Sequence, residues 1–214
     1  VAVLAHTAKD AYGNTDTFHE ADQANHSIDS VGGTRFADYI VSAGNTNGDD
    51  RGNWMTGYAG ADTLVGSIYN DGIDYNQEVN EHDNNDAGGL RGVIVNLTGA
   101  TISGINGVTG QGSNQSVAAG SAIDSFGARD VLHGLNQAAL FDDVHGTQFN
   151  DYIVVTTPTT NTSQDSDIEG DDGDDYLKIG SQNGHLHGGG GSDTLIGGAG
   201  VDGNSSFYDP GAGD

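Results

Sequence analysis

Large apolar residues stand singly along much of this chain, among glycines and acidic or amide side chains. In the clearest units, 57–65 (GYAGADTLV), 170–178 (GDDGDDYLK) and 188–196 (GGGGSDTLI), an apolar residue follows an aspartate by two positions. Between the glycine clusters lie short β-forming runs such as 39–41 (YIV) and 152–155 (YIVV), and no segment keeps a 3.6-residue period over the length of a helix. The pattern therefore predicts short strands separated by tight turns.

These units follow a nine-residue pattern, G-G-x-G-x-D-x-U-x, in which U is a large apolar residue. Glycines allow tight turns that expose backbone carbonyls, the aspartate adds a carboxylate oxygen, and the apolar residue points into a narrow core. Two units make one 18-residue coil, so equivalent turns of neighbouring coils stack. We predict that 170–175 lies beside 188–193, and that Asp175 and Asp193 share one calcium ion with turn carbonyls.

The same spacing predicts further, weaker calcium sites. It pairs 66–71, which carries Asp71, with 48–53, where Asn53 replaces the aspartate, and it sets Asp202 opposite Gly184. Fewer carboxylates predict lower affinity for calcium. The predicted metal-binding positions are Asp38, Asn53, Asp62, Asp71, Asp151, Asp175, Asp193 and Asp202, with the turn glycines Gly57, Gly170, Gly173, Gly188, Gly191, Gly197 and Gly200.

A longer duplication underlies the nine-residue units. The stretch 31–42 (VGGTRFADYIVS) returns 113 residues later as 144–155 (VHGTQFNDYIVV), and 10–16 (DAYGNTD) matches 124–130 (DSFGARD). We therefore predict two repeat copies, residues 1–92 and 93–214. The second copy carries a Gly/Ser/Asn/Gln-rich insertion at about 98–120, which predicts a surface loop or an irregular extra coil.

Composition narrows the choice of partners. The 31 acidic and six basic residues give a net charge of −25, which disfavours nucleic acid and anionic membranes and favours cations. With 34% hydrophobic residues and 36 glycines, the chain is close to the composition of disordered proteins, so we expect bound calcium to supply folding energy. Cysteine is absent, which excludes disulfides and thiolate metal sites, and no apolar run approaches the roughly 20 residues that span a bilayer.

Other candidate chemistry is sparse. His185 and His187 alternate onto one face of a predicted strand and could bind a transition metal, but the sequence supplies no third ligand beside them, so surface histidines remain the alternative. No nucleophile motif or phosphate-binding loop is present, so we expect no catalytic residue and no enzyme activity. Four aromatic residues could form a sugar-stacking patch or cover the thin core: Trp54, Tyr58, Tyr69 and Tyr75.

The nonapeptides, together with the G-T-x-F-x-D-Y-I segments at 33–40 and 146–153, resemble the RTX, or haemolysin-type calcium-binding, repeat family. The resemblance implies an all-β fold, a right-handed parallel β-roll or β-helix solenoid with calcium-binding turns. It also implies type I secretion and folding in external calcium. The expected function is a calcium-stabilised structural repeat module of a large secreted or cell-surface bacterial protein, of the adhesin, surface-layer or filament type.

Two alternatives stay open at this point: a non-catalytic accessory domain of an extracellular enzyme, and a carbohydrate-binding module. Because 1–4 (VAVL) resembles 94–97 (IVNL), we expect the chain to be part of a longer tandem array. The expected partners are calcium, further repeats of the same or identical chains through self-assembly, and cell-surface polysaccharide.

Overall fold

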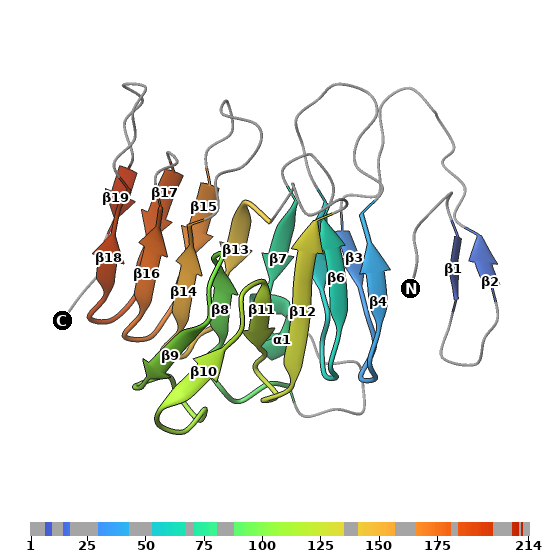
Figure 1. Cartoon of the computed structure of the whole chain (residues 1–214), viewed down its shortest axis with the longest axis horizontal. Coiled ribbons are helices and arrows are strands. Elements are labelled where there is room, and N and C mark those ends of the chain that lie inside the picture. The colour runs from blue at the N-terminus through green and yellow to red at the C-terminus, as the bar shows by residue number, and fades with distance from the viewer. Residues whose placement is uncertain are drawn as a thin grey trace.

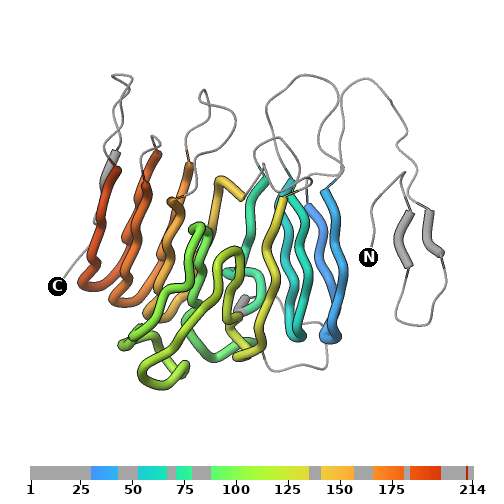
Figure 2. Tube along the Cα trace, viewed as in Figure 1, coloured from blue at the N-terminus to red at the C-terminus, as the bar shows by residue number. Residues whose placement is uncertain are grey.

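The computed structural model describes residues 7–9, 15–17, 30–42, 53–66, 71–80, 88–134, 141–156, 166–180, 184–198, 207–209 and 211. In this part of the chain, most strands belong to two sheets that face each other across a common core (Figures 1 and 2). Consecutive strands often cross from one sheet to the other through a short turn, so segments far apart in the sequence become neighbours within each sheet.

One sheet contains seven described strands, and every pairing in it is parallel. Its order is β19 (Phe207–Asp209), β17 (Gly184–His187), β15 (Ser166–Glu169), β13 (Asp143–His145), β7 (Gly72–Asp74), β5 (Trp54–Thr56) and β3 (Ser30–Gly32).

The facing sheet contains eight described strands and is mixed, because β11 runs antiparallel to both of its neighbours. Its order is β18 (Thr194–Ile196), β16 (Tyr176–Ile179), β14 (Tyr152–Val155), β8 (Ile94–Leu97), β11 (Ser121–Ile123), β12 (Arg129–Gly134), β6 (Thr63–Gly66) and β4 (Tyr39–Val41). Two antiparallel pairs, β1 (Thr7–Lys9) with β2 (Thr15–Thr17) and β9 (Ile102–Ile105) with β10 (Gln115–Val117), and a short helix, α1 (Asn76–Asn80), complete the described elements.

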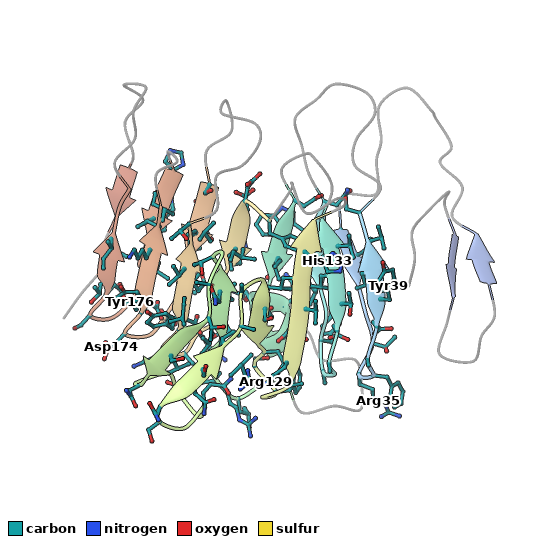
Figure 3. The ribbon with its side chains drawn as sticks, in the orientation of Figure 1. Arg35, Tyr39, Arg129, His133, Asp174 and Tyr176 are labelled. Atoms are coloured by element: carbon teal, nitrogen blue, oxygen red, sulfur yellow. The ribbon has the colours of Figure 1, made fainter. Side chains whose placement is uncertain are left out.

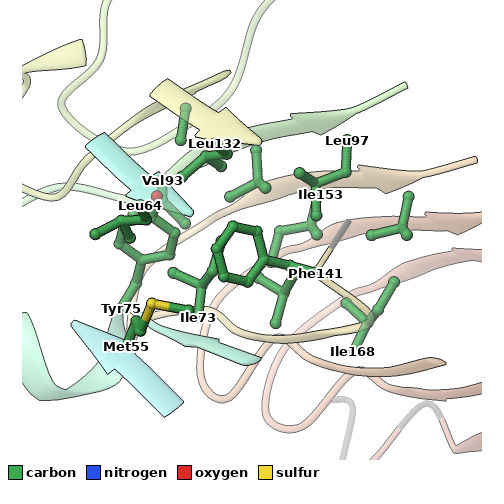
Figure 4. Packing of buried hydrophobic residues seen from close by; sticks show 14 of the residues in the cluster. Met55, Leu64, Ile73, Tyr75, Val93, Leu97, Leu132, Phe141, Ile153 and Ile168 are labelled. Atoms are coloured by element: carbon green, nitrogen blue, oxygen red, sulfur yellow. The ribbon is translucent and has the colours of Figure 1, made fainter. Parts of the chain in front are cut away.

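A narrow apolar core lies between the two sheets (Figure 4). Because side chains alternate along a strand, a three-residue strand whose central residue faces the core sends only that side chain inward. The predicted inward positions of the three nonapeptides are confirmed, because Leu64 and Leu177 are fully buried and Leu195 is partly buried against the core. Three further single apolar residues, Met55, Ile73 and Leu186, are also fully buried.

The duplication seen in the sequence is also visible in the strands. Strands β3 to β7 recur in order as β13 to β17, so that Met55 corresponds to Ile168 and Ile73 to Leu186. The sheets nevertheless continue from one copy to the next, since β12 pairs with β6 and β13 pairs with β7. The two copies therefore share one core.

The inserted segment at about 98–120 folds into a hairpin, β9 and β10, rather than into an irregular loop or coil. Ile105, Val108 and Val117 form a second small core with Ile94 and Ile123. Strand β8 is consequently buried on both faces, with Val95 and Leu97 in the main core and Ile94 under the hairpin.

The all-β character agrees with the prediction, but the predicted uniform right-handed parallel β-roll or β-helix solenoid is wrong. The eight-stranded sheet mixes parallel and antiparallel pairs, and neighbouring parallel strands are offset by 18 residues in some pairs (Trp54 with Gly72) and by 24 in others (Ser30 with Trp54). The physical reason for the reversal is the tight turn after β11. Asp124 Oδ1 accepts hydrogen bonds from the amides of Phe126 (3.0 Å) and Ala128 (2.6 Å), which closes a hairpin instead of a crossover.

Candidate metal centre

Five described turns lead from the seven-stranded to the eight-stranded sheet, and each starts with glycine and ends with aspartate five residues later. They are 33–38, 57–62, 146–151, 170–175 and 188–193. Figure 3 labels residues of the first and fourth, Arg35 and Asp174, at the lower ends of the strands.

The final aspartates of these turns are linked by hydrogen bonds across neighbouring turns. The amide of Asp151 donates to Asp175 Oδ1 (2.8 Å), and the amide of Asp175 donates to Asp193 Oδ1 (2.9 Å). The amide of Asp38 donates in the same way to Asp62 Oδ1 (2.7 Å). The predicted neighbours Asp175 and Asp193 therefore do lie in adjacent turns, as the pairing of β16 with β18 requires.

In the two G-T-x-F-x-D turns, the aspartate is bound by the threonine that follows the glycine. Asp38 Oδ2 accepts hydrogen bonds from the amide (2.5 Å) and the hydroxyl (2.8 Å) of Thr34. Asp151 accepts from the amide (2.6 Å) and the hydroxyl (3.0 Å) of Thr147, one on each carboxylate oxygen. These two carboxylates find their partners inside their own turns.

The three G-x-x-G-x-D turns have a different backbone. The residue after the first glycine lies in the left-handed region, with φ of 61° at Tyr58, 68° at Asp171 and 93° at Gly189. The second glycine also has positive φ, between 126° and 140°, at Gly60, Gly173 and Gly191. In these turns one carboxylate oxygen, Oδ2, is occluded from solvent and accepts no hydrogen bond, in each of Asp62, Asp175 and Asp193.

Each of these oxygens lies directly over the first glycine of its own turn. A Cβ on Gly57 would stand 2.5 Å from Asp62 Oδ2. A Cβ on Gly170 would collide with Asp175 Oδ2 and would lie 2.8 Å from the carbonyl oxygen of Gly188. Carboxylate and carbonyl oxygens thus converge on a space that only glycine leaves open, and an all-oxygen donor set of this kind suits calcium.

The turn carboxylates also repel one another. Burial, with the nearby charges of Asp151 and Asp193 adding to it, raises the pKa of Asp175 to about 8. Burial likewise raises the pKa of Asp62 and of Asp151 to about 7. A cation in the turns would reverse this effect by favouring the ionised carboxylates.

A second acidic group, which the sequence analysis missed, lies inside the molecule around α1. Glu78 is fully buried and accepts hydrogen bonds at Oε2 from the amide (3.2 Å) and hydroxyl (2.6 Å) of Ser125. Its Oε1 and Asp124 Oδ2 accept none, and Asp130 Oδ2 has only the Tyr75 hydroxyl at 3.4 Å. The only sign of this group in the sequence is the pair of aspartates at the two ends of 124–130, a segment that also marks the duplication.

Burial and mutual repulsion act strongly on this interior group. Burial first, and then the charges of Asp124 and Asp130, raise the pKa of Glu78 well above its ordinary value. Burial raises the pKa of Asp130 to about 8 and that of Asp124 to about 6. Since Asp130 accepts the amide of Asp62 (3.0 Å), the interior group is joined to the row of turn aspartates.

The predicted pairing of Asn53 with Asp71 is present between segments 18 residues apart. The amide of Asn53 donates to Asp71 Oδ1 (2.9 Å), and the Ser42 hydroxyl donates to the same oxygen (2.8 Å). Asn53 Nδ2 in turn donates to Ser42 Oγ (2.7 Å). Nearby, burial and the charges of Asp143 and Asp71 raise the pKa of Asp142 to about 8.

The remaining predicted positions are distributed as follows. Gly197 is exposed after β18, while Gly200, Asp202 and the predicted contact of Asp202 with Gly184 lie outside the described residues.

The predicted aromatic patch loses one member because Tyr75 is fully buried in the core. Trp54 packs against His145 with ring centroids 4.3 Å apart and ring planes tilted by 38°, and Tyr69 lies outside the described residues.

Comparison of the chain with protein-family models, with curated proteins and with solved structures found no match. Among the described residues, no helix is long and apolar enough to span a membrane.

Proposed function

We propose that this chain is a calcium-stabilised structural repeat module of a large secreted or cell-surface bacterial protein. The observation that carries the proposal is the set of occluded, unbonded Oδ2 atoms of Asp62, Asp175 and Asp193 in the three G-x-x-G-x-D turns. Leaving a buried carboxylate oxygen without a partner is unfavourable, and a cation between stacked turns removes that penalty.

The donor chemistry favours calcium over other cations. Asp62, Asp175 and Asp193, with backbone carbonyls such as that of Gly188, would hold the ions. Bound calcium supplies positive charge that compensates the buried carboxylates. Hard oxygen ligands in a flexible turn suit calcium better than magnesium, which demands an octahedral shell and gives up water reluctantly.

The expected affinity favours an extracellular location. A turn that provides one or two carboxylates and completes its shell with carbonyls belongs with the weaker calcium sites, whose Kd is on the order of 10⁻⁴–10⁻³ M. Such sites fill in calcium-rich surroundings outside the cell. The resemblance of the nonapeptides to RTX repeats, and through it export by a type I route, is consistent with this location.

We also propose that the module associates with further repeats of the same kind. Among the described strands, β4 and β18 are outermost in one sheet, and the side chains of Tyr39 in β4 (50%) and Ile196 in β18 (36%) are exposed. An uncovered edge strand is a template for pairing with another strand. On this basis the module contributes rigidity and length to a larger assembly, and we assign it no catalytic step.

The test is a calcium titration of the purified chain, followed by far-UV circular dichroism, with bound calcium counted by equilibrium dialysis. We expect β structure to increase cooperatively with calcium at neutral pH, two or more ions to bind, and excess EGTA to reverse the increase. Magnesium at the same concentration is the control and should have little effect. An unchanged spectrum in excess EGTA, or fewer than one bound ion per chain, would overturn the proposal.

A further inference from the structure

The outer face of the seven-stranded sheet carries a second, chemically different group of side chains. Leu186 of β17 is fully buried, so its neighbours His185 and His187 both point away from the core. In the adjacent strand β15, Asp167 is in register with His185, and Glu169 is in register with His187. Two imidazoles and a carboxylate therefore lie together on adjacent strands.

The three groups are close enough to share one ion. One ligand atom from each of Asp167, His185 and His187 lies within 4.8 Å of the other two. His187 Nε2 is 3.6 Å from Asp167 Oδ1, which is too long for a hydrogen bond. Two ligand atoms on a tetrahedral zinc ion, each about 2.0–2.1 Å from the metal, stand about 3.4 Å apart, so the observed separation is close to that of two zinc ligands.

The Asp167 carboxylate oxygen nearest His187 lacks a hydrogen-bond partner. Asp167 Oδ1 is occluded from solvent and accepts no hydrogen bond. The backbone around it is fixed, because the amide of Asp167 donates to Asp143 Oδ1 (2.9 Å) in β13. The two imidazole rings do not stack, since their planes are inclined at 70° with centroids 6.3 Å apart, so their nitrogens can approach a common point.

We propose that Asp167, His185 and His187 form a binding site for one divalent transition-metal ion, best matched by zinc, on the outer face of the sheet. Imidazole nitrogens favour zinc over calcium, which prefers oxygen ligands only. Three protein ligands leave a fourth tetrahedral position for water or for a group from another molecule. Glu169 lies beside the site, with its Oε2 3.3 Å from His145 Nε2.

This site is distinct from the calcium turns in its place and its chemistry. The third ligand escaped the sequence analysis because it stands 18 residues before His185, in the preceding strand of the sheet. It becomes a neighbour only through the parallel register of β15 and β17. The inference does not depend on calcium occupying the turns, and the two can be tested separately.

The experiment is isothermal titration of zinc into the calcium-saturated chain, repeated on single variants. We expect His187→Ala and Asp167→Asn each to weaken one zinc site by at least about tenfold. The matched control is His133→Ala, which removes a histidine of β12 whose Nδ1 lies 3.5 Å from the Gly134 carbonyl oxygen in the other sheet. It should leave this site unchanged. Equal zinc affinity in all three variants and the unmodified chain would overturn the proposal.

A second readout uses the unmodified chain, so it does not depend on whether the variants fold. Cobalt bound to the unmodified chain should give the intense visible bands of a tetrahedral site with nitrogen ligands, and zinc should displace it. In NMR spectra of the imidazole nitrogens, the signals of His185 and His187 should shift together on metal addition. A weak octahedral cobalt spectrum, or shifts confined to other histidines, would count against the site.

Discussion

At the scale of single residues, the position directly after the turn glycine decides whether the turn aspartate has a hydrogen-bond donor inside its own turn. Thr34 and Thr147 donate an amide and a hydroxyl to the aspartate four residues later. Asp171 and Gly189 adopt left-handed φ instead, and Asp175 Oδ2 and Asp193 Oδ2 remain without a hydrogen bond. One side chain thus separates a self-contained turn from one suited to a cation.

Asp175→Asn should lower stability in calcium but not in its absence. Without calcium, at about pH 8, the substitution removes a buried, repelled charge and should leave the unfolding free energy unchanged or higher. With saturating calcium it removes a ligand and should lower the unfolding free energy by about 1–3 kcal/mol. Urea unfolding in both conditions measures the difference.

The control for this prediction is Asp38→Asn, in a turn whose threonine already binds the carboxylate. It should lower stability by about 1 kcal/mol whether or not calcium is present. If Asp175→Asn behaved in the same way as Asp38→Asn, the distinction between the two kinds of turn would have no consequence for metal binding.

The raised pKa values predict how stability depends on pH. Asp175 and Asp130 have pKa values of about 8 and Asp62 of about 7 in the folded chain, against about 3.9 for an unperturbed aspartate. The calcium-free folded chain therefore holds extra protons, and its stability should fall as pH rises from about 4 to about 8. With calcium bound, the carboxylates are held ionised, so stability should instead fall as pH is lowered. Urea unfolding of metal-stripped and calcium-saturated protein at several pH values measures both slopes, and slopes of the same sign would contradict the prediction.

At the scale of elements, the G-x-x-G-x-D turns depend on backbone that only glycine adopts easily. Gly189 has φ of 93°, and a Cβ there would collide with the carbonyl oxygen of Asp171 in the neighbouring turn. Gly189→Ala should therefore lower the unfolding free energy in calcium by about 2 kcal/mol or more.

Gly99→Ala is the matched control for the turn. A Cβ at exposed Gly99 would meet no atom within 4 Å, so the substitution should change stability by no more than about 0.5 kcal/mol. Urea unfolding of both variants in the same calcium buffer gives the comparison. Similar stabilities for the two would show that the left-handed backbone of the turn is not required.

The nonapeptide pattern predicted the strands and their inward residues because spacing and side-chain alternation fix both. The contact of Asp175 with Asp193 followed from the same spacing. The antiparallel β11 did not, because nothing in the nine-residue period indicates that Asp124 closes a hairpin turn. Nor could the sequence place Glu78 beside Asp124, since that contact depends on where the strands preceding and following the insertion pair.

At the scale of the whole molecule, the two sequence copies share one core and are expected to fold as one unit. The pairs β6 with β12 and β7 with β13 cross the boundary between the copies, and core residues from both copies pack in one cluster. Calcium bound in the turns of one copy is therefore expected to stabilise the other copy as well.

The row of turn aspartates has a direction. In every link of that row the amide belongs to the earlier turn and the carboxylate to the later one, from Asp38 to Asp62 and from Asp151 through Asp175 to Asp193. Each carboxylate therefore protects the amide of the turn that precedes it along the sheet, so loss of one carboxylate should expose only the amide of the preceding turn.

In hydrogen-exchange NMR, Asp193→Asn should speed exchange at the amide of Asp175 by about fivefold, the equivalent of about 1 kcal/mol. Asp151→Asn should instead expose the amide of Val93, which donates to Asp151 Oδ1 (2.6 Å), and leave that of Asp175 protected. Exchange that rose equally on both sides of a substituted turn would contradict this polarity, whereas a one-sided response means that order spreads through the module from its later turns toward its earlier ones.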